Sequence, residues 1–228
     1  MTEYPDKNTI DDSDLFTLPK FENIIVEQKT FSYMLATIQH AVQSVYNGYI
    51  AGEFIDIMQS LITGQMTQAY QQAWEDDGNT DFGLPDFLQS ALNENISRNL
   101  NFDYIYQYYK DIIDARVDGT PVEPLIARAS LWANRYNEAY NEAVALITER
   151  TGGKLVWNLG PTEQHCGSCA PLDGIVAYAT EWVLAGVHPQ NAPNSALECG
   201  GWNCKCTLTP TNERKTRNAW NRILSAIQ

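Results

Sequence analysis

The chain has 228 residues, of which 44% are hydrophobic and 19% are charged, and these proportions exclude wholesale disorder. A formal net charge of -13 disfavours nucleic-acid binding by the chain as a whole. The acidic N-terminus lacks the apolar core of a signal peptide, and no apolar run reaches the roughly 18 residues of a membrane span. We therefore expect synthesis in a cytoplasm and no association with a membrane.

Residues 1–18 are predicted to form an extended acidic arm. Its only basic residue is Lys7, and its acidic residues are Glu3, Asp6, Asp11, Asp12 and Asp14. A segment of this composition stays solvated and does not bury a core.

Residues 19–153 are predicted to form a helical domain, because apolar residues recur there at steps of three and four. A first helix ends near Gly48, a second runs from Phe54 to Trp74, and Pro85 opens the first of two shorter helices. The four apolar stripes contain Phe31, Met34, Leu35, Ile38, Val42 and Val45, then Ile57, Met58 and Leu61, then Phe87, Leu88, Ala91, Leu92 and Ile96, and finally Tyr104, Ile105, Tyr108, Ile112 and Ile113.

The strongest helical pattern runs from Pro121 to about Thr151, with proline at its start and Gly152 after its end. Its apolar seam alternates steps of four and three, and its small residues allow another helix to approach closely. The seam consists of Leu125, Ala129, Trp132, Tyr136, Ala139, Ala143 and Leu146. It packs either inside a helical bundle of this chain or against a partner protein.

Residues 154–211 are predicted to form a small module with short strands. We place strands at 154–159, at 175–178 after the turn at Asp173 and Gly174, and at 204–209, where Pro210 ends the last one. The predicted fold class is therefore α+β and mainly α, with a domain of long helices followed by a small cysteine-containing β module.

The module carries every cysteine of the chain, at Cys166, Cys169, Cys199, Cys204 and Cys206. A C-x-x-C pair and a later cysteine group, brought together, offer the thiolates of a tetrahedral zinc site. We predict a structural zinc ion on four of them, with His165 and His188 in reserve. The four ligands are Cys166, Cys169, Cys204 and Cys206, with Cys199 as the alternative.

Two other chemistries remain open for these cysteines. Disulfides would form if the mature protein left the cell inside a particle, although five thiols leave one unpaired. The second alternative is a redox-active dithiol at Cys166 and Cys169. The pattern around it is unlike that of a thioredoxin, because no β-α-β pattern surrounds it and Pro171 blocks an immediate long helix. Zinc-deaminase, metalloprotease and nucleotide-loop motifs are absent, so we expect no catalytic residues and no enzyme.

Residues 212–228 are predicted to form a basic helix or tail. From Lys205 onward the only acidic residue is Glu213, whereas the basic residues are Lys205, Arg214, Lys215, Arg217 and Arg222. This end of the chain either contacts DNA or an acidic partner, or forms a solvated polar face.

Four segments between Leu125 and Pro210 form a combined pattern: the helical stretches 126–129 and 134–139, the knuckle HCGSCAPLDG at 165–174 and the closing CGGWNCKC at 199–206. Together they resemble the Mu F-like head morphogenesis proteins of tailed bacteriophages. Many members have arginine where this chain has Lys205, and His-Pro nearer to the closing cysteines than His188 and Pro189 are here.

The resemblance implies a structural minor capsid protein, made in the host cytoplasm and located in the virion, inside the head near the portal vertex. It further implies contacts with the portal protein and other capsid proteins, a role in head assembly or in genome packaging and delivery, and a basic C-terminus facing packaged DNA. The alternative is a zinc- or thiol-dependent enzyme or effector, since Mu F-like modules can be joined to effector domains. The chain ends shortly after Cys206, so we expect no appended catalytic domain.

Overall fold

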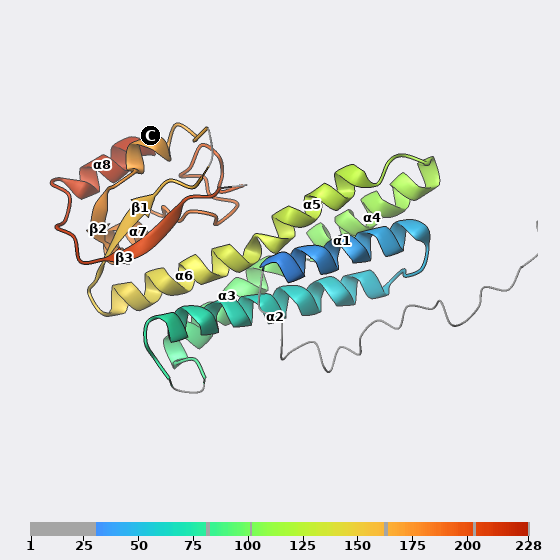
Figure 1. The fold of residues 1–228 in the computed structure, drawn as a ribbon, viewed down its shortest axis with the longest axis horizontal. Coiled ribbons are helices and arrows are strands. Elements are labelled where there is room, and N and C mark those ends of the chain that lie inside the picture. The colour runs from blue at the N-terminus through green and yellow to red at the C-terminus, as the bar shows by residue number, and fades with distance from the viewer. Residues whose placement is uncertain (1–30, 81–82, 101, 162–163, 203, 228) are drawn as a thin grey trace, which may run out of the picture.

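The structure is a computed structural model that describes residues 31–80, 83–100, 102–161, 164–202 and 204–227. The predicted acidic arm, 1–18, lies outside these residues. The fold-class prediction is confirmed, because the described chain is mainly helical and carries one small antiparallel sheet. Figure 1 shows the long helices side by side, with the sheet near one end of the group.

Six helices come first in the described chain: α1 Phe31–Asn47, α2 Glu53–Asp76, α3 Asp86–Asn99, α4 Phe102–Asp118, α5 Glu123–Ala133 and α6 Arg135–Arg150. The module then contains β1 Lys154–Asn158, the short 3-10 helix η3 Ala170–Leu172, β2 Val176–Tyr178, α7 Ala179–Leu184, β3 Thr207–Thr211 and α8 Ala219–Ala226. The helix α7 was not predicted from the sequence.

Among the side chains that the structure describes, the helical body packs the predicted apolar stripes against one another, except for Tyr104, which is 69% exposed. The helix α2 packs against α6 and α3, and α1 packs against α4 and α5. Ala129, Ala139 and Ala143 of the predicted seam are fully buried in this core, and the larger seam residues pack around them. The seam is therefore used within the chain, as a bundle requires.

The single helix predicted from Pro121 to Thr151 is wrong in detail, because the structure divides it at Asn134. The Asn134 backbone stays near the helical region, and the two helices follow one another along nearly one line in Figure 1. The Asn134 side chain accepts a hydrogen bond of 3.0 Å from Asn137 Nδ2. Such local bonds of asparagine compete with regular helix geometry.

The sheet has the order β2-β1-β3, with both pairs antiparallel. Leu155 and Trp157 of the central strand are buried, while Lys154, Val156 and Asn158 are half-buried, which is the alternation expected of a strand. Pro210 was predicted to end the last strand, but it lies inside β3 opposite Leu155. An edge strand tolerates proline, because only one of its sides needs backbone donors.

A second hydrophobic core lies under the sheet. It contains Trp157 and Trp182, whose ring centroids lie 5.8 Å apart, and Ala145 from α6. The helix α6 thus contributes to both cores. The predicted C-terminal segment also joins the second core, because Ala219 and Ile223 of α8 are buried in it.

Candidate metal centre

The five thiols of the module meet beside the sheet, in loops that follow β1, precede η3 and precede β3. The Sγ atoms of Cys166, Cys169 and Cys199 all lie within 4.8 Å of one another, and so do those of Cys169, Cys204 and Cys206. All four predicted ligands and the alternative Cys199 are therefore brought together. The cluster can hold a metal ion, and thiolate is a ligand for soft ions.

The first knuckle is folded by its own backbone. The N–H groups of Cys169 and Ala170 donate to the Cys166 carbonyl at 3.1 and 3.2 Å, so the two cysteines stand on one tight turn that leads into η3. Their Sγ atoms lie 3.0 Å apart as free thiols. The turn is tied to the loop that carries Cys199, because the Glu198 N–H donates to Ser168 Oγ at 3.0 Å.

The second cysteine group depends on two glycines. Gly200 and Gly201 have φ of 60° and 78°, in the left-handed region that side chains avoid. A Cβ on Gly201 would overlap the Asn191 carbonyl, so the loop closes on itself at this point. The Gln190 Nε2 donates to the Cys206 carbonyl at 2.9 Å and joins the start of this loop to its end.

Gly160 holds the end of β1 against the last cysteines. A Cβ at Gly160 would fall well inside 3.0 Å of the Lys205 carbonyl oxygen, so only glycine allows the two backbones to lie this close. The Gly160 backbone is also among the groups that lower the pKa of the Cys206 thiol, after the thiols of Cys169 and Cys204.

Backbone hydrogen bonds and thiol neighbours make the five sulfurs unequal. Hydrogen bonds from the Cys169 and Cys204 thiols lower the pKa of Cys206 to about 3, whereas Cys204 and Cys206 raise the pKa of Cys169. Burial raises the pKa of Cys199 to about 11. Burial opposes ionisation of Cys166 too, but hydrogen bonds from Cys169 and Cys199 lower its pKa. Metal binding to such a cluster requires thiolates, so it would release protons from the cysteines that bind the ion.

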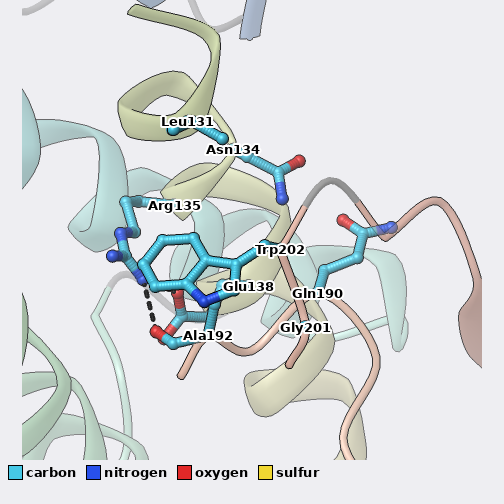
Figure 2. Close-up of a pocket in the computed structure, with 8 residues that line it drawn as sticks. All are labelled: Leu131, Asn134, Arg135, Glu138, Gln190, Ala192, Gly201 and Trp202. Carbon is cyan, nitrogen blue, oxygen red and sulfur yellow. Dashed lines mark hydrogen bonds and ion pairs between the residues drawn. The ribbon is translucent and has the colours of Figure 1, made fainter. Parts of the chain in front are cut away.

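Arg135 of α6 connects the helical body to the cysteine loop (Figure 2). Its Nη1 donates to Glu138 Oε2 at 2.7 Å and to the Ala192 carbonyl at 2.8 Å, and its guanidinium carbon lies 5.5 Å from the Trp202 ring centroid. Burial raises the pKa of Glu138, and the Arg135 charge opposes this shift. The loop that carries Cys199 is therefore anchored by a nearly buried ion pair.

The sequence indicated every cysteine of the cluster but not the residues that position them. Gly160, Gln190 and the Arg135 contacts act across long stretches of chain, and no local pattern marks them. The two reserve histidines fall outside the close sulfur groups. His188 is half-buried, and burial lowers its pKa, as expected for a neutral side chain.

No family model, no curated protein and no solved structure matches the chain. Among the described helices, none combines the length and the apolar character that a bilayer crossing requires.

Proposed function

We propose that the chain is a structural minor head protein of a tailed bacteriophage, located inside the head near the portal vertex. In this role it contacts the portal protein and other capsid proteins during head assembly or during genome packaging and delivery. The proposal rests on the Mu F-like resemblance of the segments 126–129, 134–139, 165–174 and 199–206.

The observation that carries the proposal is that contacts link three of these segments, 134–139, 165–174 and 199–206. The Arg135 guanidinium carbon lies 5.5 Å from the Trp202 ring centroid, and Arg135 also donates to Ala192 in the loop before the closing cysteines. The two cysteine segments supply the converging thiols. Residues of the sequence pattern thus take part in joining the helical body to the module, while 126–129 lies within the helical body.

We further propose that the metal is zinc and that it has a structural role. The predicted set, Cys166, Cys169, Cys204 and Cys206, supplies the thiolates that zinc prefers. Four thiolates at about 2.3 Å from zinc lie about 3.8 Å from one another, so modest movements close a tetrahedron. A module of this small size gains stability from such a metal site.

The basic C-terminal residues are proposed to face packaged DNA. Arg214, Arg217 and Arg222 are exposed, whereas Lys215 pairs with Glu181 at 2.8 Å. Replacing the three arginines by glutamine should abolish retention of the protein on DNA at low salt and leave the fold intact. Retention that persists in this variant would remove DNA from the list of partners.

The head-protein proposal is tested on particles. Quantitative mass spectrometry of density-purified phage particles from the source culture should find the chain in a few copies per particle, and an antibody should reach it only after the heads are opened. Its absence from purified particles would contradict the proposal.

A thiol oxidoreductase is the second candidate, because Cys166 is partly exposed and its sulfur lies 3.0 Å from that of Cys169. A redox pair would react with an alkylating reagent much faster at Cys166 than at the other cysteines. Slow and uniform alkylation of the metal-free protein would exclude this function.

A further inference from the structure

The five thiols divide into two sets of three that share one residue. Within each set every pair of Sγ atoms lies within 4.8 Å, while no four of the five cysteines satisfy this condition. Cys169 belongs to both sets, with Cys166 and Cys199 on one side and Cys204 and Cys206 on the other. A single tetrahedral ion would leave one of the five sulfurs without a role.

Cys169 lies in the middle of the group. Its Sγ lies 3.0 Å from that of Cys166 and within 4.8 Å of those of Cys199, Cys204 and Cys206. Cys169 is also only 2% exposed, so this central position is buried.

We propose that the cluster is a dinuclear thiolate centre in which Cys169 bridges two metal ions. Each ion then has three sulfur ligands, and the five thiols are used completely. A bridging sulfur must lie within reach of both ions, and Cys169 is the one cysteine that belongs to both sets. This inference rests on the proposed metal binding and changes its stoichiometry.

Charge also favours a second ion. Two divalent ions leave one net negative charge on five thiolates, whereas one divalent ion on four thiolates leaves two, and uncompensated charge is costly beside the buried Cys204 and Cys206. The ions belong to the soft, filled-shell class, and the charge favours zinc(II) over copper(I), because two copper(I) ions would leave three negative charges. Copper(I) is satisfied by three thiolates, whereas zinc(II) takes a fourth ligand, for which the half-buried side of Cys166 and Cys199 admits solvent.

Native mass spectrometry of the reduced, full-length protein gives the first test, since ion number and ion mass are read together. Two ions are expected, and the mass distinguishes zinc from copper. One ion in the wild-type protein would overturn the bridge but keep the metal proposal. A metal-free protein would overturn both.

Two matched variants locate the ions. Cys199→Ser should lose the ion of the first set, and Cys206→Ser the ion of the second, so each should keep one ion. Retention of the full wild-type number in Cys199→Ser would show that Cys199 is not a ligand and would refute the two-set arrangement.

Cobalt titration of the wild-type protein tests the bridge without any substitution. Two high-spin cobalt(II) ions that share a thiolate couple antiferromagnetically. The electron paramagnetic resonance signal should therefore rise during the first equivalent and fall during the second. A signal that rises in proportion through both equivalents would show that the two ions do not share Cys169.

Discussion

Replacing Gly160 by alanine should weaken the metal centre although no cysteine is changed. The new Cβ would fall inside 3.0 Å of the carbonyl oxygen, the carbonyl carbon and the Cβ of Lys205, whereas ordinary contacts of a Cβ lie at 3.4–4 Å. Two of these atoms belong to the backbone, so no rotamer change relieves the overlap. The end of β1 and the segment of Cys204 and Cys206 must separate by on the order of 1 Å.

The cost has two parts. Overpacking of this kind typically destabilises a protein by about 1–3 kcal/mol. Metal-ligand distances tolerate shifts of only about 0.2 Å, and Cys206 follows Lys205 in the segment that must move away from Gly160. We therefore expect zinc affinity to fall about 10–100-fold, the usual effect of losing a group that supports a ligand.

The assay is competition for zinc with a chromophoric chelator, together with urea unfolding. Gly64→Ala is the matched control, because Gly64 lies inside α2 and a Cβ there meets no atom within 4 Å. This control should keep wild-type zinc affinity and gain about 0.5–1 kcal/mol of stability. Wild-type affinity in Gly160→Ala would refute the close approach of β1 to the cysteines.

Three further predictions concern the junction and the second core. Arg135→Met should destabilise the protein by about 3–5 kcal/mol at neutral pH, because Glu138 stays buried without its partner. In urea unfolding, the double variant with Glu138→Leu should recover most of this loss. No recovery in the double variant would contradict the pairing of Arg135 with Glu138. Burial raises the pKa of Glu138 above 4.5, so its contribution to stability is full below that pH and is lost as the pH rises through the folded pKa. The stability of wild type relative to Glu138→Gln should accordingly fall between pH 4.5 and neutrality, and a constant difference would show that Glu138 has an ordinary pKa. Ile223→Ala should lower the free energy of unfolding by about 2–5 kcal/mol in thermal or urea unfolding, because Ile223 is buried. The control Leu184→Ala changes a side chain that is 77% exposed and should alter stability by less than about 0.5 kcal/mol. Equal effects of the two substitutions would place α8 outside the core.

The helical part of the fold was predictable because its signal is local. Apolar steps of four and three at Ile38, Val42 and Val45 place these residues on one face, and that face is buried. The helix α7, by contrast, spans only Ala179–Leu184, which is too short for a periodic pattern to emerge. Its position depends on Trp182, which enters the second core and donates to the Leu155 carbonyl at 3.2 Å.

The candidate site was predictable in its chemistry but not in its arrangement. The sequence places all five cysteines in one short module, and their spacing indicates that the thiols meet in the fold. Spacing carries no information on which sulfur lies in the middle, because this depends on contacts such as that of Gly160 with Lys205. Likewise, Pro210 predicts a strand end only if the strand is central, and the order of strands is a tertiary property.

Hydrogen exchange measured by mass spectrometry, with and without a zinc chelator, tests most directly whether a metal closes the cysteine module. With metal bound, the amides of β1, β2 and β3 should be protected together with those of η3. Removal of the metal should release protection in the module while α1 and α2 keep theirs, since the helical body has its own core. Equal protection of the module in both conditions would contradict the account, because the thiols would then have no part in holding the fold.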